Sequence, residues 1–320
     1  MPSSLQDLEV VIARQIATVR ASEPRLSPAV EAAAELVPSL VTELGLGTFR
    51  GAVLSDAKPR LLLGFAVDPA GPLGELGPEI VLKIYGDQPR GEGPLLSMWQ
   101  ERGLPVPHVR FGERGGCSWL ALQRLPLKAI RPRGRDETLA VTTEVAANAV
   151  QMHAPAPRLS SVLRPLDTVM LPRWEAAVAT LCTSGHRIPA HWQPLAAIAY
   201  RSGDRVPLHG DLGLPNIARG PDDRLVIYDA SALLGPLAFD SARWAARLAD
   251  DTVSPEELMD RWRTLEELPR AHHLLAAECV LEAGSREFVT KRETAAGCDR
   301  LLHPQAMRLV ETAERLFTAG

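Results

Sequence analysis

Apolar residues recur at helical spacing over the first part of the chain. Between Leu5 and Arg20 they fall three or four residues apart, which predicts one amphipathic helix. A second helix is expected from Ser27 to Leu44, because Ser27 can cap its first turn and Pro28 suits the first helical position. The chain is therefore expected to begin with two helices.

The pattern then changes to short apolar runs separated by glycine, proline and aspartate, which predicts a mainly antiparallel set of strands. One helix is expected among them at about 91–102, and the glycine- and proline-rich stretch 68–78 predicts a long exposed loop. The predicted strands are Thr48–Leu54, Leu61–Val67, Glu79–Tyr85, His108–Gly112 and Ser118–Leu125.

Beyond about residue 126 the periodicity becomes helical again, with one small group of strands at 206–229. This change divides the chain into a β-rich lobe at 1–124 and a larger helical lobe at 125–320, so an α+β fold is expected. The predicted helices of the second lobe are Thr138–His153, Pro172–Thr183, Pro194–Arg201, Phe239–Leu248, Ser254–Leu265, Arg270–Phe288 and Pro304–Phe317.

The composition limits which kinds of binding partner and which cellular compartment are expected. Hydrophobic residues make up 46% of the 320 residues, and the formal net charge of −4 comes without a basic stripe, so no nucleic-acid partner is expected. No apolar run is long enough to span a membrane and no secretory signal is visible, so a cytoplasmic protein is expected. The cysteines form no CxxC pair and are expected to be free, buried thiols: Cys117, Cys182, Cys279 and Cys298.

Three polar side chains in the second half have the spacing of a phosphoryl-transfer site. Asp211 lies in the loop LHGDLGLPN (208–216), Asn216 follows it, and Asp229 ends the apolar run LVIYD (225–229). In the kinase arrangement one aspartate orients the acceptor hydroxyl, while an asparagine and a second aspartate hold Mg²⁺ against the phosphates. The spacing predicts Asp211 as the catalytic residue and Asn216 and Asp229 as metal ligands.

A lysine in the first half supplies a second part of that arrangement. Lys83 lies inside the apolar run EIVLKIYG (79–86), where an unpaired ammonium group is costly to bury. The predicted partner is Glu92, at the start of the next helix, with Glu101 as the reserve candidate. The pair is expected to hold the donor phosphates. The other interpretation is a lysine on the solvent face of an edge strand.

The remaining nucleotide contacts are expected from two backbone segments. The stretch LGLGTFRGAV (44–53) offers glycines for a phosphate-covering loop, with Thr48 and Phe49 at its tip, although these glycines could equally make ordinary turns. Residues 123–126, which include Arg124, are expected to form the hinge whose backbone contacts adenine or guanine.

The loop sequence HGDxxxxN resembles that of the aminoglycoside phosphotransferase family, and QMHAPAP (151–157) resembles its streptomycin 6-kinase and hydroxyurea phosphotransferase branch. This resemblance implies a protein-kinase-like fold of two lobes, with nucleotide and Mg²⁺ in the cleft. It also implies that Asp240 anchors the loop backbone. His209 is expected to hold the loop by hydrogen bonds and to transfer no proton.

The chain departs from the family pattern at several positions. Gly213-Leu214-Pro215 stands where the family has His-Pro-Gly, Ser231 where the branch often has lysine, and no aspartate separates Gly235 from Pro236. The three polar groups above are unaffected, so these departures bear on the identity of the acceptor more than on catalysis.

The sequence therefore predicts an ATP- or GTP-dependent, Mg²⁺-dependent O-phosphotransferase. Its acceptor would be a small molecule with a hydroxyl group, either an aminoglycoside-type antibiotic or a sugar. If the acceptor is an antibiotic, a role in antibiotic resistance is expected. A non-catalytic, kinase-like nucleotide-binding protein is the alternative. A metal-dependent hydrolase using Asp211, Asp229 and His209 is a more distant one. The acceptor, the choice of nucleotide and the oligomeric state stay open.

Overall fold

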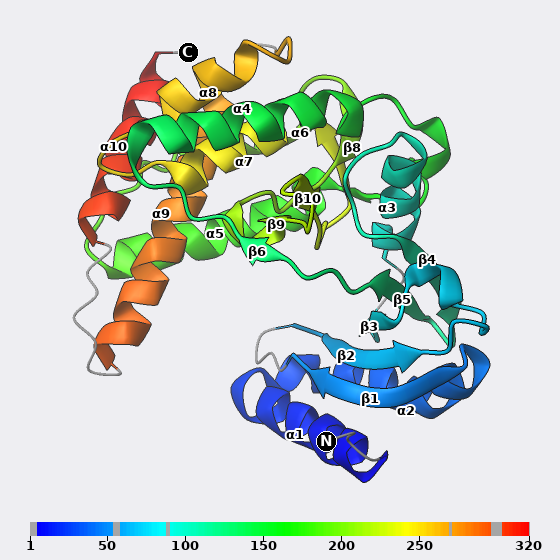
Figure 1. The fold of residues 1–320 in the computed structure, drawn as a ribbon. Helices are drawn as coiled ribbons and strands as arrows, with labels where there is room; N and C mark the ends of the chain where they lie inside the picture. The colour runs from blue at the N-terminus through cyan, green and yellow to red at the C-terminus, as the bar shows by residue number, and fades with distance from the viewer. Residues whose placement is uncertain (1–4, 54–57, 88–89, 269–270, 296–302, 320) are drawn as a thin grey trace. The chain divides into compact units, whose positions relative to one another are not determined.

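The computed structural model forms two compact units (Figure 1). The first contains residues 1–127 and 220–226, and the second contains residues 128–219 and 227–320. Leu54, Arg270 and Cys298, which were named above, lie outside the described residues. The described residues are 5–53, 58–87, 90–268, 271–295 and 303–319.

The first unit is built on a five-stranded sheet in which every neighbouring pair of strands is antiparallel, as predicted. The strand order is β1-β2-β3-β5-β4, so β3 lies at the centre of the sheet. The strands are β1 (Leu46–Ala52), β2 (Arg60–Val67), β3 (Glu79–Tyr85), β4 (Val109–Arg114) and β5 (Cys117–Gln123).

Two N-terminal helices, α1 (Leu5–Ser22) and α2 (Ser27–Glu43), pack on this sheet and enclose the core of the unit (Figure 1). The core also contains Leu73 and Leu76, each 2% exposed, from the stretch predicted to be an exposed loop. That prediction is wrong at these two positions, because burial of the leucines holds the segment against the sheet. A third helix, α3 (Glu92–Glu101), follows β3 and packs against β4.

The second unit is mainly helical, as expected. Two predicted starts are clearly too late: α4 begins at Gly134 and not at Thr138, and α5 begins at Leu166 and contains Pro172. In α5, buried Leu166 and Met170 secure the turns before the proline. The tryptophans Trp174, Trp192, Trp244 and Trp262 are all buried. The helices are α4 (Gly134–Met152), α5 (Leu166–Thr183), α6 (Trp192–Arg201), α7 (Phe239–Leu248), α8 (Pro255–Arg263), α9 (His272–Ala295) and α10 (His303–Thr318).

Short strands frame the segment that carries the predicted catalytic loop. β11 (Leu233–Pro236) pairs with β8 (Arg205–Leu208) and β7 (Arg164–Pro165), while β9 (Ile217–Arg219) pairs with β6 (Lys128–Ala129). β10 (Leu225–Ile227) precedes Asp229. The turn after β8 is therefore fixed at both ends by main-chain hydrogen bonds.

Two further expectations can be compared with the structure. Cys117 and Cys279 are buried free thiols as expected, but Cys182 is exposed, because it lies on the outer side of the last turn of α5. Within the described part of the chain, no helix is both long enough and apolar enough to cross a membrane.

Candidate active site

The turn after β8 is anchored by one buried carboxylate. Asp240, at the start of α7, accepts hydrogen bonds from the backbone N–H groups of His209 (2.8 Å) and Gly210 (2.9 Å). Gly210 has a φ of 77°, and a Cβ there would lie 2.8 Å from the Leu233 side chain, so only glycine fits this turn. The predicted anchoring role of Asp240 is confirmed.

The imidazole ring of His209 forms hydrogen bonds to both the Asp211 loop and the segment just before Asp229. Its Nδ1 accepts the backbone N–H of Asp211 at 3.2 Å, and its Nε2 donates to the carbonyl oxygen of Tyr228 at 3.0 Å. Both ring nitrogens are therefore engaged with the main chain on either side of the site. This is the loop-holding role expected from the sequence, with Nε2 as the donor nitrogen and Nδ1 as the acceptor.

Asn216 lies against Asp211, as the spacing required. Its Nδ2 donates to the Asp211 carbonyl oxygen (2.7 Å) and is 3.3 Å from Asp211 Oδ2, which turns the amide oxygen away from Asp211. The Asn216 carbonyl oxygen accepts the N–H of Tyr228 at 3.0 Å. These bonds bring the backbone before Asp229 alongside the loop that carries Asp211 and Asn216.

Asp229 has an unusual backbone conformation. Its φ is 57°, in the left-handed region, and Ala232 three residues later has a φ of 52°. Aspartate tolerates this region better than most residues, but two such residues so close together are held there only by their surroundings. The half-buried Asp229 is thus turned out of the strand direction directly after Tyr228.

Two arginines from α7 hold the Asp211 carboxylate. Arg247 Nη2 donates to Asp211 Oδ1 at 2.7 Å, and Arg243 Nη2 donates to the same oxygen at 3.0 Å. Burial by itself would raise the pKa of Asp211, but the positive charges of Arg247 and Arg243 hold it well below its usual range. Asp211 is therefore ionised at every physiological pH.

Gly213, one of the departures from the family pattern, makes room for one of these arginines. Arg247 Nη1 donates to the carbonyl oxygens of Asp211 (2.9 Å) and Leu212 (3.1 Å), so its guanidinium lies across the loop. A Cβ at position 213 would lie 2.9 Å from that nitrogen. The missing side chain of Gly213 and the position of Arg247 are thus two parts of one arrangement.

Arg243 is itself buried and shared between two carboxylates. Its Nη1 donates to Glu278 Oε2 on α9 at 2.8 Å, and Tyr200 donates its hydroxyl to the other Glu278 oxygen at 2.8 Å. The Arg243 Nε is buried without a hydrogen-bond partner among the described residues. A chain of buried polar groups therefore runs from α6 through α9 and α7 to Asp211.

His153 forms buried hydrogen bonds with Asp240 and with a second carboxylate. Its Nε2 is 3.1 Å from Asp240 Oδ2 and its Nδ1 is 2.8 Å from Glu266 Oε1, with all three side chains buried. Burial would lower the pKa of His153, but the hydrogen bonds to Asp240 and Glu266 raise it to about 9. The segment QMHAPAP contains this histidine, yet nothing in the sequence indicates that Glu266 is its second partner.

In the first unit, the predicted lysine–glutamate pair is present. Lys83 is 1% exposed and its Nζ lies 2.8 Å from Glu92 Oε1 and 2.6 Å from Oε2, so the partner is Glu92 and not Glu101. Tyr85 donates its hydroxyl to Glu92 Oε2 at 3.0 Å. Because β3 is central in the sheet, the alternative of a lysine on the solvent face of an edge strand is wrong.

The structure does not place Thr48 and Phe49 at a loop tip. Both lie inside β1, and Phe49 is buried in edge-to-face contact with Phe65 at 5.7 Å between ring centroids. The prediction is wrong because this stretch pairs with β2 through two irregularities in register, which accommodate Gly47 and Gly51 within the strand. Arg124, just after β5, donates to Glu79 at 3.1 Å, and its backbone N–H bonds the Glu79 carbonyl oxygen.

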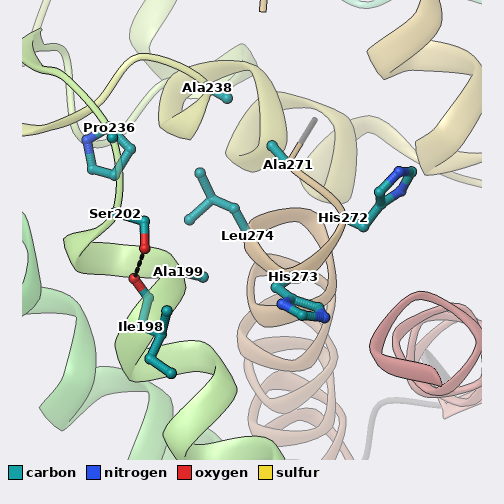
Figure 2. Close-up of a pocket in the computed structure, with 10 residues that line it drawn as sticks. Ile198, Ala199, Ser202, Pro236, Ala238, Ala271, His272, His273 and Leu274 are labelled. Carbon is teal, nitrogen blue, oxygen red and sulfur yellow. Dashed lines mark hydrogen bonds between the residues drawn. The ribbon is translucent and has the colours of Figure 1, made fainter. Parts of the chain in front are cut away.

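A mostly apolar pocket of about 330 Å³ lies elsewhere in the second unit (Figure 2). Residues of α6, the end of β11 and the start of α9 line it, among them Ile198, Pro236, His272 and Leu274. None of the predicted site residues is among the residues that line it.

The fold is similar to that of solved phosphotransferases, at low sequence identity. Spectinomycin phosphotransferase, solved with ADP and spectinomycin, has 10% identity and a TM-score of 0.54 over 89% of this chain and 97% of that chain. A protein from Ralstonia eutropha JMP134 that is provisionally assigned as an aminoglycoside phosphotransferase has 15% identity and a TM-score of 0.55 over 89% and 97%. An aminoglycoside-3′-phosphotransferase of type VIII has 17% identity and a TM-score of 0.51 over 78% and 98%.

These likenesses confirm the predicted fold class: an α+β chain with the small antiparallel sheet and the larger helical part of the kinase-like aminoglycoside phosphotransferases. No protein-family model matches the chain, and no curated protein matches it in sequence.

Proposed function

We propose that this chain is a Mg²⁺-dependent O-phosphotransferase that transfers the γ-phosphoryl group of ATP or GTP to a hydroxyl group of a small molecule. The observation that carries the proposal is the loop geometry, in which Asp211 and Asn216 are 3.3 Å apart at their side chains on a backbone anchored by Asp240. Phosphoryl transfer depends on positioning and charge neutralisation, and this loop supplies a fixed position.

Asp211 would orient the acceptor hydroxyl and accept its hydrogen bond. Its low pKa makes it a weak base, so its contribution is the orientation of the attacking oxygen and the removal of the proton late in the transfer. Arg243 and Arg247 hold its carboxylate in place and offset the negative charge beside the incoming phosphoryl group.

Asn216 and Asp229 fit a magnesium ion by their chemistry. One offers an amide oxygen turned away from Asp211 and the other a half-buried carboxylate, and both are the hard oxygen ligands that Mg²⁺ takes together with phosphate oxygens. Magnesium, when bound, would neutralise the charge of the donor phosphates. In the first unit, Lys83, held by Glu92, would bind the donor phosphates. Adenine or guanine would contact the backbone at Arg124.

The acceptor class is proposed from the resemblance and the solved neighbours. The QMHAPAP segment resembles the streptomycin 6-kinase and hydroxyurea phosphotransferase branch, and spectinomycin phosphotransferase shares the fold. We therefore expect an aminoglycoside-type antibiotic or a sugar, and a role in antibiotic resistance if the former is the substrate.

The test is transfer of labelled phosphate from γ-labelled ATP or GTP, with Mg²⁺, to a panel of aminoglycosides, neutral sugars and acidic sugars. Asp211→Asn is expected to lower turnover by at least about 10³-fold, because the acceptor hydroxyl loses its orienting carboxylate. Binding of Mg²⁺–ATP, measured by calorimetry, is expected to stay within a few-fold of wild type.

Two results would count against this assignment in different ways. Turnover by Asp211→Asn at the wild-type rate would show that the mechanism is wrong. Binding of Mg²⁺–ATP by the wild-type chain without phosphorylated product across the panel would favour the alternative of a non-catalytic nucleotide-binding protein.

A further inference from the structure

Two histidines and a glutamate from three separate segments of the second unit converge on one carboxylate oxygen. His186 lies in the turn after α5, Glu287 lies within α9, and His303 is the first residue of α10. The Nε2 atom of His186 lies 3.2 Å from Glu287 Oε1, and the Nδ1 atom of His303 lies 2.5 Å from the same oxygen. No residue of this cluster belongs to the site described above.

The spacing of these atoms is close to that of a metal coordination shell. All three ligand atoms lie within 4.8 Å of one another. A tetrahedral Zn²⁺ ion with bonds of about 2.0–2.1 Å to nitrogen and oxygen places its ligand atoms about 3.3 Å apart. The His186–Glu287 separation of 3.2 Å is close to this value, whereas the His303 nitrogen is nearer to the same Glu287 oxygen, so the ring of His303 would have to move away from that oxygen to make room for the ion.

Burial and exposure also suit an ion. The Glu287 and His186 side chains are 4% and 10% exposed, so the carboxylate is largely out of water, where an opposite charge is most strongly bound. The His303 side chain is 44% exposed, which leaves it free to adjust and leaves the ion a path from solvent. The two imidazole rings stand 5.2 Å apart between centroids, at an interplanar angle of 46°, so they do not stack face to face.

We propose that His186, Glu287 and His303 form a three-ligand site for a divalent transition metal, with Zn²⁺ as the expected ion and water as the fourth ligand. Two imidazoles and one carboxylate are a ligand set that Zn²⁺ takes in proteins, and Mg²⁺ disfavours imidazole. The bound ion would join the end of α5 to α9 and α10. It would therefore stabilise the packing of the last two helices.

The experiment uses the full chain stripped of metal with a chelator and titrated with Zn²⁺ in excess Mg²⁺, which occupies sites made only of hard oxygen ligands. Calorimetry is expected to show one zinc ion per chain. Co²⁺ in place of Zn²⁺ is expected to give the intense visible absorption of a four- or five-coordinate ion. Thermal unfolding is expected to move to higher temperature when Zn²⁺ is added.

The variants His186→Ala and His303→Ala are each expected to weaken zinc binding by more than about 100-fold, because loss of a ligand costs at least as much as loss of a group that orients one. His303 is half-exposed, so its replacement should leave the fold intact, which circular dichroism checks. His272→Ala, at an exposed histidine on the same helix as Glu287, is the matched control and should bind zinc as the wild type does.

The proposal is overturned if the wild-type chain binds no zinc at millimolar concentration. It is also overturned if His186→Ala and His303→Ala bind as tightly as wild type and give the same cobalt spectrum. In either case the three residues form a hydrogen-bonded cluster only. Neither result bears on phosphoryl transfer, because the titration measures metal binding without nucleotide.

Discussion

At the residue scale, the buried ion pair Lys83–Glu92 illustrates how far sequence reasoning reaches. A charged residue inside a buried strand needs a partner, and the kinase arrangement, in which a strand lysine pairs with a helix glutamate, pointed to the glutamate at the start of the following helix. The arginines on Asp211 were not predicted. Nothing in the local sequence around Arg243 and Arg247 says which loop their helix will face, because that contact is made by the tertiary fold.

The pair gives a direct stability prediction. Glu92→Ala leaves the Lys83 ammonium buried without its partner and is expected to lower the free energy of unfolding by about 3–5 kcal/mol. The double variant Lys83→Met with Glu92→Leu should recover most of that loss, because no charge is then buried. Denaturant unfolding measures both.

Glu101→Ala, at an exposed position on the same helix, is the control and should change stability by no more than about 0.5 kcal/mol. If Glu92→Ala were as mild as the control, the ion pair would not contribute to the stability of the first unit.

The buried His153 predicts a pH dependence of stability. Its pKa is raised from the ordinary 6.5 to about 9 in the folded chain, so its stabilising contribution is fully present below about pH 6.5 and is lost as the pH rises through 9. The free energy of unfolding is therefore expected to fall over that interval, as measured by denaturant unfolding at successive pH values.

His153→Gln is expected to be less stable at neutral pH and to show a smaller decline between about pH 6.5 and 9. Burial by itself would raise the pKa of Asp240, but His153 lowers it. Asp240 therefore changes its protonation only at acid pH and does not contribute to the change in stability between about pH 6.5 and 9. An unchanged slope in the variant would show that His153 is neutral in the folded chain.

At the element scale, α7 carries most of the support for the candidate site. Asp240, Arg243 and Arg247 fall three and four residues apart, so they share one face of the helix. The other end of α7 is held by Arg286 from α9, whose Nη2 donates to the carbonyl oxygens of Arg247 and Ala249 at 3.1 Å each. The positive charge of an arginine at the C-terminal end of a helix also interacts favourably with the partial negative charge of the helix dipole there.

Loss of this cap should be measurable. Arg286→Met is expected to destabilise the chain by about 2 kcal/mol, because charged hydrogen bonds to carbonyls that stay buried are lost. Arg315→Met removes an exposed ion pair with Glu256 instead and should cost at most about 1 kcal/mol. Equal effects of the two variants on the unfolding midpoint would contradict the capping role.

Element boundaries were predicted most accurately for two elements of seven and ten residues. The strand Glu79–Tyr85 and the helix Phe239–Leu248 were predicted with their observed bounds. The errors fall where a local signal was overruled by packing. Glycines at 45, 47 and 51 indicated a loop, but β1 pairs with β2 through irregularities in register, and Pro172 indicated a helix start, but α5 runs through it.

At the scale of the whole molecule, the change from strand period to helix period was enough to predict the α+β fold. The two- to four-residue strands β6, β7 and β11 were not predicted, because so short a run has no period that distinguishes it from a loop. These strands nevertheless fix the ends of the segment with Asp211, so the site depends on elements that only tertiary pairing reveals.

The proposed nucleotide contacts fall in both units, which gives a prediction for the complete chain. Mg²⁺–ATP at 100 times its dissociation constant is expected to raise the free energy of unfolding by about 2.7 kcal/mol. Lys83→Met and Asp229→Asn should each reduce that increase, since one removes a proposed phosphate contact and the other a proposed metal ligand. Thermal unfolding with and without nucleotide measures the effect, and full stabilisation of both variants would show that neither residue contacts the nucleotide.

The spacing of Asp240, Arg243 and Arg247 along α7 sets where each side chain can reach. Each residue of an α-helix adds about 100° of rotation and 1.5 Å of length. One residue inserted between Asp240 and Arg243 would leave the carboxylate on the loop but swing both guanidinium groups away from Asp211. The three contacts with one loop therefore depend on the number of residues between these positions as much as on their side chains.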